Sequence, residues 1–286
     1  MSRITEVVYF GFELELLEAH IAEHRQHVDR MIVAEQQLTS TGYPKPLFAR
    51  DNRKRFEKYD VELVEVPTDG YQKIVPETNR PGFPFEGRLI HQEKIKKRYM
   101  HPLVIAGADW VLHSDTDEII TEWDKVKATL DEGKGINDHV GFTLTETSGY
   151  VNVRTGHRSV YRFARAVEGF DPAHALKSLP RGFVAVHCGW HFSMCCSSLE
   201  EYYWKWLNRT DEWGTYGDTP PTLLAALPKL SRYLSNMGPT TDPLLIFAGK
   251  HFAVPTPENV VELANLPSFI RDNINLFPHI EVQNEV

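Results

Sequence analysis

The sequence has few cysteines, no long basic run and no long hydrophobic run. No apolar stretch approaches the roughly 18 residues of a membrane-spanning helix, so we expect no membrane span. The start of the chain lacks the apolar core of a secretory signal, which favours a cytoplasmic protein, or a catalytic domain whose anchor has been removed. Cys188, Cys195 and Cys196 are an odd number gathered in one segment, which excludes a disulfide framework and fits a reducing compartment.

Acidic residues outnumber basic ones, and the formal net charge is -8. No block of Lys and Arg is longer than Lys96-Lys97-Arg98, which argues against strong binding to nucleic-acid phosphates. A length of 286 residues, with 42% hydrophobic and 24% charged residues, is typical of a globular chain. This length allows one large α/β domain, or one domain with a C-terminal elaboration.

Predicted strands and helices alternate along the first part of the chain. We expect strands over 5–10, 28–34, 61–66 and 110–115, and helices over 13–25, 52–59, 86–99 and 122–130. Such alternation implies an α/β fold with a mainly parallel, Rossmann-like central sheet flanked by helices, and with ligands at the carboxyl ends of the strands. From Val140 onward the pattern changes to strand-like pieces over 141–147, 159–164 and 183–186.

This change of pattern predicts how a single domain over 1–286 is organised. A nucleotide-binding half covers about 1–120, and an acceptor-facing half covers about 121–210. A C-terminal extension of helix and proline-rich loop covers 211–286.

Three acidic side chains, Asp115, Asp117 and Glu118, stand at the end of an apolar run that begins at Trp110. Carboxylates at the end of a buried strand are costly to desolvate unless a positive charge lies among them. A divalent cation that carries a nucleotide diphosphate meets this need, since Mg²⁺ and Mn²⁺ bind one or two carboxylates together with substrate phosphates. The motif is the Asp-x-Asp arrangement of nucleotide-sugar glycosyltransferases.

Two other interpretations of this motif remain open. The acidic residues could cap the helix expected from Glu122, since Asp and Glu favour the first turn of a helix. A phosphatase-type nucleophile loop would need a hydroxyl residue two places after the second Asp, where Ile119 stands.

A second informative segment, residues 187–196, mixes histidine, cysteine and aromatic residues directly after a strand. Cys188, His191 and Cys195 have the ligand types of a zinc site, although no second Cys/His pair lies at a matching distance. A buried strand and loop with hydrogen-bonded histidines is the simpler structural interpretation. In a third interpretation, His191 reaches the cation or diphosphate across the cleft, and Trp190 forms a wall beside the sugar.

The chain resembles glycosyltransferase family 17, the family of the bisecting β-1,4-N-acetylglucosaminyltransferase. The resemblance has three anchors in the family's order, between about residues 5 and 210. They are the opening segments 12–18, 28–35 and 42–47, the acidic motif 114–119, and the Gly-Trp-His motif at 189–193. Ile120 departs from the family pattern, which usually has Pro at this position.

The resemblance implies a GT-A fold, a UDP-sugar donor carrying N-acetylglucosamine, a Mn²⁺ or Mg²⁺ cofactor, and inversion at the anomeric carbon. The acceptor would be a hydroxyl of a glycan or another molecule. Asp117 is expected to bind the cation directly, with His191 as a further ligand. Asp115 is expected to contact the ribose or the cation through water, and Glu118 to orient the loop.

Inversion also requires a base that takes the proton of the acceptor hydroxyl. The candidates are Glu200, which we rank first, then Glu146, and further Asp171 and Glu201. Glu200 and Glu201 each follow a serine by three positions, so both equally fit the capping box of a helix.

Three residues could contact the donor from elsewhere in the first half of the chain. Arg88 and Gln92 lie one helical turn apart and could reach uracil or phosphate from one face, or could belong to a solvated helix surface. Lys45 lies in a loop near the carboxyl end of a strand and could meet a phosphate, or be an ordinary surface lysine.

Two rival functions remain open at this point. The first is a GT-A glycosyltransferase of another family, with a different donor or with a modified nucleobase as acceptor. The acidic charge balance argues against a nucleic-acid acceptor, although transfer to a modified base would use the same donor chemistry. The second is a carbohydrate- or nucleotide-binding module without catalysis.

Overall fold

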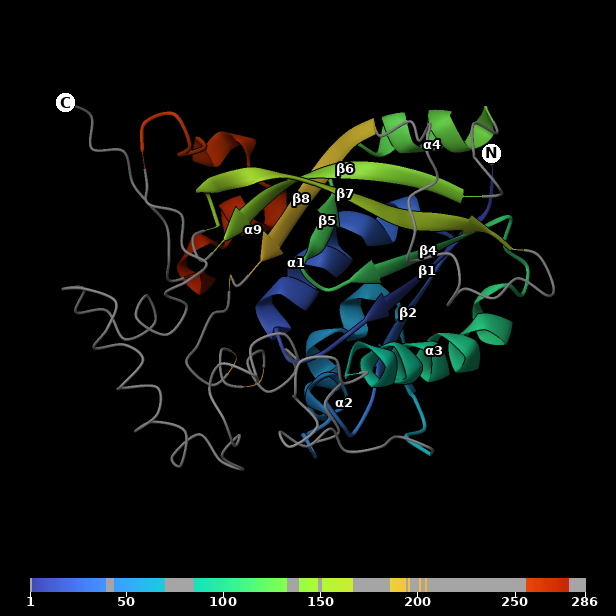
Figure 1. Ribbon diagram of the computed structural model, residues 1–286. Helices are drawn as coiled ribbons and strands as arrows, with labels where there is room; N and C mark the ends of the chain where they lie inside the picture. Colours follow the sequence, from blue (N-terminus) through green and yellow to red (C-terminus); the bar gives the residue numbers. More distant parts are fainter. Residues whose placement is uncertain are drawn as a thin grey trace, which may run out of the picture.

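An eight-stranded sheet in the order β3-β2-β1-β4-β7-β6-β8-β5 forms the centre of the protein (Figure 1). The computed structural model describes residues 2–39, 44–69, 85–132, 139–148, 151–166, 186–193, 195, 201, 204 and 256–277. The strands are β1 (Ile4–Tyr9), β2 (Arg30–Glu35), β3 (Glu62–Glu65), β4 (Trp110–Asp115), β5 (Glu118–Ile120), β6 (His139–Ser148), β7 (Arg154–Arg165) and β8 (Val186–Ser193). The helices are α1 (Leu14–His24), α2 (Phe48–Asp51), α3 (Phe85–Val104), α4 (Trp123–Asp131) and α9 (Ser268–Asp272).

The first half of the sheet, β3-β2-β1-β4, is entirely parallel. Helices cover both of its faces, which is why β1 and β2 are almost continuously buried. Alternate residues of β1 face opposite sides, so that Val8 packs with Leu17 of α1 while Val7 packs with Met100 of α3. The predicted α/β class with a parallel first half of the sheet is therefore confirmed.

The second half of the sheet brings distant segments together. β7 joins β4 in antiparallel orientation, β6 pairs with β7, and β8 lies between β6 and β5. The three-residue strand β5 directly follows the acidic motif and pairs Ile119 with Trp190. The acidic motif and the Gly-Trp-His motif therefore lie on neighbouring strands.

Two local expectations were wrong, and one strand was missed. The helix expected over 52–59 is instead two 3-10 turns, Arg53–Arg55 and Glu57–Tyr59, where Arg55 is drawn to Glu15 and Glu18 of α1. Strand β5 was not expected, because three residues carry too little periodicity. The strand expected over 183–186 instead continues from Val186 to Ser193, and 183–185 lie outside the described residues.

The interpretation of the acidic residues as a helix cap is also wrong. α4 begins at Trp123 and its N-cap residue is Glu122, whereas Glu118 already belongs to β5. The division of the chain into two halves and an extension remains a prediction. In the described part of the extension, Ser268 and Phe269 donate hydrogen bonds to Glu23 of α1. No helix among the described residues is long and apolar enough to cross a bilayer.

A buried polar cluster lies inside the apolar core, beneath the carboxyl end of β4. We call it the Glu6 cluster, and it consists of Glu6, His20, His24 and Ser114. The Glu6 carboxylate accepts hydrogen bonds from His20 Nε2 at 2.8 Å, His24 Nδ1 at 2.9 Å and the Ser114 hydroxyl at 2.7 Å. Burial alone would raise the pKa of Glu6, but His24 and His20 hold it well below its usual range.

We expect this cluster to make the protein lose stability as the pH falls from 6.5 to 4. Burial lowers the pKa of His24 from 6.5 to about 4, against the opposing attraction of Glu6. Between these values the unfolded chain binds a proton that the folded chain does not, so acid favours unfolding by on the order of 3 kcal/mol. Urea unfolding measured across this range checks the prediction, with His24→Gln as the control that removes the titrating group. Equal pH dependence in the wild type and His24→Gln would contradict it.

Candidate active site

The acidic motif forms a tight turn between β4 and β5, which we call the acidic turn (residues 115–118). Asp115 is exposed at the carboxyl end of β4, level with Tyr9 at the end of β1. The buried Glu118 carboxylate accepts the backbone N–H of Asp115 at 3.1 Å, and the carbonyl of Asp117 accepts the N–H of Phe192 at 2.7 Å. Glu118 therefore orients the turn, as expected.

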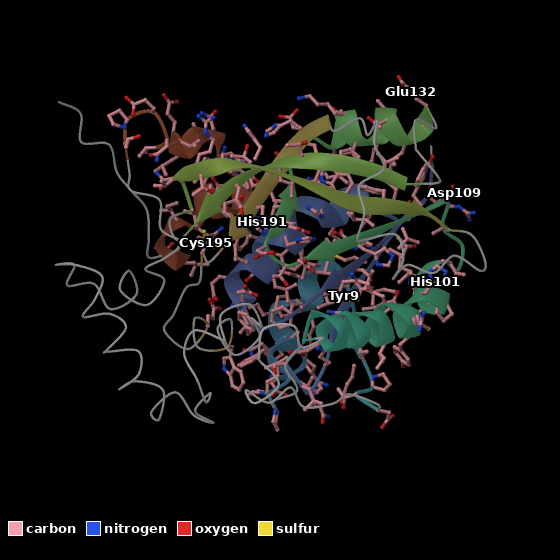
Figure 2. The ribbon with its side chains drawn as sticks, in the orientation of Figure 1. Tyr9, His101, Asp109, Glu132, His191 and Cys195 are labelled. Carbon is pink, nitrogen blue, oxygen red and sulfur yellow. The ribbon has the colours of Figure 1, made fainter. Side chains whose placement is uncertain are left out.

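Three of the predicted site residues, each from a different part of the sequence, lie together at this turn. Figure 2 labels the central one, His191. His191 Nε2 is 3.7 Å from Asp117 Oδ2, and His191 Nδ1 is 3.5 Å from Glu146 Oε1. The pairing of β8 with β5 and β6 places them there, since His191 lies opposite Glu118 on one side and Glu146 on the other. His191 is 5% exposed, whereas Asp117 is 15% and Glu146 31% exposed. A buried imidazole therefore lies between two carboxylates that reach solvent.

Asp117 and His191 fit a divalent cation. Their 3.7 Å separation is too long for a hydrogen bond, but two ligands at about 2 Å from one ion can stand this far apart. The described residues that bring three ligand atoms within 4.8 Å of one another belong to the Glu6 cluster, so Asp115, Asp117 and His191 form no closed cage. An open site suits Mg²⁺ or Mn²⁺, which keep positions for water and substrate phosphates.

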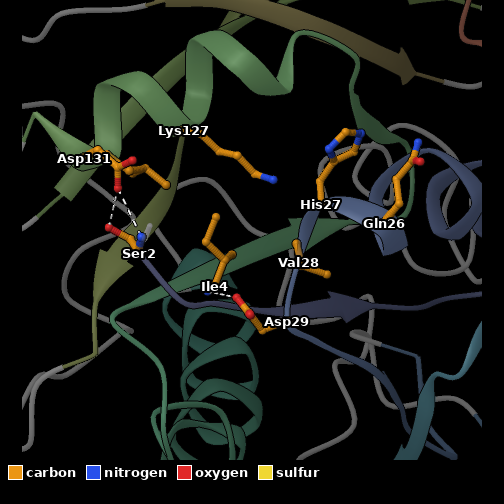
Figure 3. A pocket seen from close by; sticks show the side chains of 9 residues that line it. Ser2, Ile4, Gln26, His27, Val28, Asp29, Lys127 and Asp131 are labelled. Carbon is orange, nitrogen blue, oxygen red and sulfur yellow. Dashed lines mark hydrogen bonds between the residues drawn. The ribbon is translucent and has the colours of Figure 1, made fainter.

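The opposite edge of the sheet carries a cavity of about 180 Å³ at the amino ends of β1 and β2 (Figure 3). Asp29 and Asp131 at its wall already accept backbone N–H groups, from Ile4 and Ser2. Ligands of open α/β sheets bind at the carboxyl ends of the strands, so this cavity is not the candidate active site.

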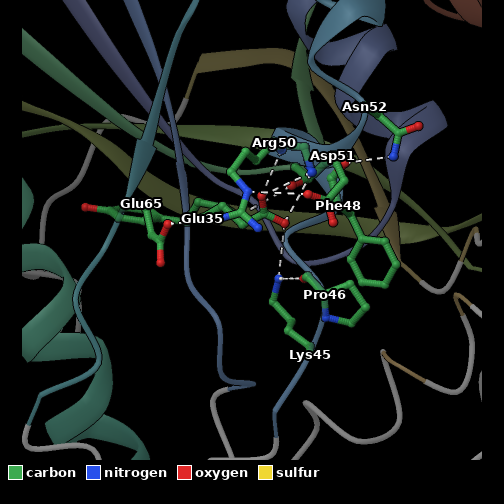
Figure 4. Close-up of polar contacts among 11 residues, drawn as sticks. Glu35, Lys45, Pro46, Phe48, Arg50, Asp51, Asn52 and Glu65 are labelled. Carbon is green, nitrogen blue, oxygen red and sulfur yellow. Dashed lines mark hydrogen bonds and ion pairs between the residues drawn. The ribbon is translucent and has the colours of Figure 1, made fainter.

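Lys45 is not a surface lysine (Figure 4). Its ammonium donates to the Glu35 carboxylate at 3.2 Å, and its side chain is 3% exposed. Glu35 also accepts the backbone N–H groups of Ala49 and Arg50 at the start of α2. The ammonium thus has a carboxylate partner within the protein and holds the loop, while a contact between Lys45 and a phosphate stays a prediction.

The structure describes the other predicted donor and base residues only in part. Arg88 and Gln92 lie in α3, but their side chains are outside the described part of the structure, as are Glu200 and Asp171 altogether. Glu201 is buried, and its carboxylate accepts the N–H of Leu14 at 3.2 Å. This bond holds the start of α1, which is a structural role.

The zinc interpretation of the second segment is wrong. Cys188 packs in the apolar cluster beneath α1 and α4, where burial raises the pKa of its thiol to about 12. Cys195 packs in a different apolar cluster beside α9, so the two thiols do not share a site. Trp190 is buried and stacks on Phe192, with 6.0 Å between the ring centroids. A contact between Trp190 and a sugar stays a prediction, and core packing is its observed role.

Sequence reasoning missed two groups near the acidic turn. The first is Tyr9, at the end of β1, whose hydroxyl shares a hydrogen bond of 3.0 Å with His113 Nδ1. Lys96 Nζ lies 4.7 Å from the centre of the Tyr9 ring. The second group is the Glu6 cluster. His20 and His24 stand four positions apart on one helix face, and this spacing was the available signal.

The sheet order, with the acidic turn at the end of β4 facing β8, is that of an α/β protein of the GT-A type. Residues 1–209 match the family model of glycosyltransferase family 17, and the chain belongs to this family. None of the curated proteins compared with the chain matches it.

Several solved structures resemble parts of the chain weakly. Glucosyl-3-phosphoglycerate synthase from Mycobacterium tuberculosis, in complex with Mn²⁺, UDP and phosphoglyceric acid, is 16% identical at a TM-score of 0.26, over 51% of this chain and 43% of that one. Its complex with Mn²⁺, UDP and glucosyl-3-phosphoglycerate is 15% identical at 0.32, over 90% and 82%. TarS 1-349 from S. aureus is 12% identical at 0.31, over 94% and 85%. In several of the similarities, the chain spans less than half the length of the other protein. At these TM-scores, the ligands of the solved structures are not assigned to this chain.

Proposed function

We propose that the protein is an inverting, metal-dependent glycosyltransferase that moves N-acetylglucosamine from UDP to a hydroxyl of a glycan or another acceptor. The observation that carries the proposal is the grouping of Asp117, His191 and Glu146 at the carboxyl edge of the sheet. Membership of family 17 supports sugar transfer and makes the alternative of another glycosyltransferase family wrong. The choice of N-acetylglucosamine rests on the sequence resemblance to the bisecting enzyme.

Asp117 and His191 are the residues that would hold Mn²⁺ or Mg²⁺. The cation would offset the negative charge that develops on the diphosphate as UDP departs. Asp115, two positions earlier in the acidic turn and exposed, would contact the ribose or a water of the cation. Glu118 keeps the backbone of Asp115 in place through its hydrogen bond.

Two roles are compatible with the position of the Glu146 carboxylate. Its carboxylate is partly exposed and lies on the opposite side of the His191 ring from Asp117, as a base acting away from the leaving group requires. A carboxylate beside the second nitrogen of a metal-binding histidine can instead fix the orientation and tautomer of the ring. Glu200 remains a candidate base on its sequence position alone.

Release of UDP from a panel of UDP-sugars and other nucleotide-sugars, with and without Mn²⁺, tests the proposed function. We expect release from UDP-N-acetylglucosamine that requires the cation, with water serving as acceptor where no other acceptor is present. Faster release from another UDP-sugar would replace the donor assignment. UDP binding without release from any donor would favour a binding module.

The same assay on Glu146→Gln separates the two roles of this residue. A base predicts a fall in kcat of about a hundredfold or more, with an unchanged Mn²⁺ requirement. An orienting role predicts that more Mn²⁺ is needed for half-maximal rate. Full activity at the wild-type Mn²⁺ concentration would exclude both and leave Glu200 as the candidate.

A further inference from the structure

The Glu6 cluster is bonded to both strands that flank the acidic turn. Ser114, which donates to Glu6, directly precedes Asp115 in β4. On the other side, His24 Nε2 accepts the backbone N–H of Ile120 in β5 at 2.7 Å. A single buried carboxylate is therefore linked to the entry and the exit of the turn.

The hydrogen bond to Ile120 determines where the protons lie. A backbone N–H can only donate, so His24 Nε2 carries no proton and Nδ1 must carry one. That Nδ1–H points at Glu6, as do the His20 Nε2–H and the Ser114 hydroxyl. The cluster is thus an ionised carboxylate with three donors, which is the arrangement in which a buried charge is tolerated.

The same proton positions argue against a cation in the cluster, although Glu6, His20 and His24 bring ligand atoms within 4.8 Å of one another. A cation at His24 Nδ1 would move the ring proton to Nε2. Two donors would then face each other across the 2.7 Å between Nε2 and the Ile120 nitrogen. The geometry fits a hydrogen-bonded network and not a metal site.

Strand β5 needs such support more than the other strands do. It has three residues, stands at the edge of the sheet, and pairs only with β8 among the described strands. A charged network is an expensive way to gain stability, because well-packed apolar side chains of similar volume often serve as well. The network contributes geometry more than stability, because hydrogen bonds are directional and hold β5 at a fixed position relative to α1 and β4.

We propose that the Glu6 cluster positions the acidic turn, so that Asp117 stays facing His191 at the separation a cation needs. Glu6, His20 and His24 are positioning residues, since they act through Ser114 and Ile120 and not on the donor. This inference rests on the proposed function, because the consequence that matters is binding of the cation and UDP.

Two substitutions of His24 test its two hydrogen bonds separately, because each removes one bond and keeps the other. In His24→Asn the side-chain amide takes the place of Nδ1, keeps a donor to Glu6 and loses the acceptor for Ile120. In His24→Gln the amide oxygen takes the place of Nε2, keeps the acceptor for Ile120 and loses the donor to Glu6. Val28→Ala, in the core at the amino end of β2, is the matched control for lost stability.

The measurement is UDP titration at several Mn²⁺ concentrations, well below the Tm of each variant, together with amide hydrogen exchange over residues 115–120. We expect His24→Asn to weaken the apparent affinity for Mn²⁺ about tenfold and to speed exchange in the turn. His24→Gln, which keeps the acceptor for Ile120 and leaves the bond between Ser114 and Glu6 intact, should do much less at comparable loss of Tm, and so should Val28→Ala. Wild-type Mn²⁺ affinity and exchange in His24→Asn would overturn the positioning role, as would bound metal in the cluster. A wild-type protein whose UDP binding ignores Mn²⁺ would overturn the proposed function instead.

Discussion

Replacing Asp117 by alanine should abolish Mn²⁺-dependent binding of UDP and lower the transfer rate about a thousandfold. Asp117 is the acidic side chain that lies 3.7 Å from His191 Nε2, and it remains partly exposed. Without its carboxylate, His191 alone would hold the cation, and the charge developing on UDP would lack its counterpart. Isothermal titration with UDP, with and without Mn²⁺, checks this directly.

Two controls make the result interpretable. Asp117→Asn keeps the size of the side chain and removes its charge, so it should lose Mn²⁺ dependence without loss of stability. Asp124→Ala removes an exposed carboxylate from the first turn of α4 and should leave UDP binding unchanged. UDP affinity that ignores both Mn²⁺ and Asp117→Ala would disprove the metal site.

Replacing Gly189 by alanine should damage the fold and the site together. A Cβ on this residue would lie 2.1 Å from the carbonyl oxygen of Ile119 and 2.8 Å from the Cα of Ile120. Both are backbone atoms of β5, so relief requires β5 to move away from β8. We expect a loss of about 3 kcal/mol or more in the free energy of unfolding, measured by urea denaturation.

Gly156→Ala in β7 is the matched control, because a Cβ there meets no atom within 4 Å. It should change stability by no more than about 0.5 kcal/mol. In the Gly189 variant, the shift of β5 should also remove the Mn²⁺ dependence of UDP binding, since Asp117 lies next to β5. Wild-type stability in that variant would show that β5 and β8 are not packed as described.

The first half of the fold was predictable because its signals are local. Strands β1 to β4 and helices α1, α3 and α4 were expected within a few residues of their observed bounds. Each is long enough for its hydrophobic period to show in the sequence. The 3-10 turns over 53–59 were not predictable in this way, because the basic side chain of Arg55 is drawn to α1, a partner 37 residues earlier in the chain.

The candidate site was predictable in part. The acidic motif and the Gly-Trp-His motif indicate Asp117 and His191 by sequence alone, and Glu146 is among the candidate bases that the sequence offers. Lys45 illustrates the limit, because only the fold shows that its ammonium is held by Glu35. Glu6 illustrates it further, since one acidic residue in an apolar strand does not reveal which donors surround it.

The sequence by itself determined the alternation of strands and helices, the family, and most of the residues of the candidate site. Their types and spacing along the chain are sufficient for this, because periodicity and motifs are local properties. Only the tertiary structure decided that His191 lies between Asp117 and Glu146, and that Glu6 is linked to both ends of the acidic turn. Those contacts depend on which strands become neighbours, and β8 takes its place between β6 and β5 only when segments far apart in sequence join one sheet.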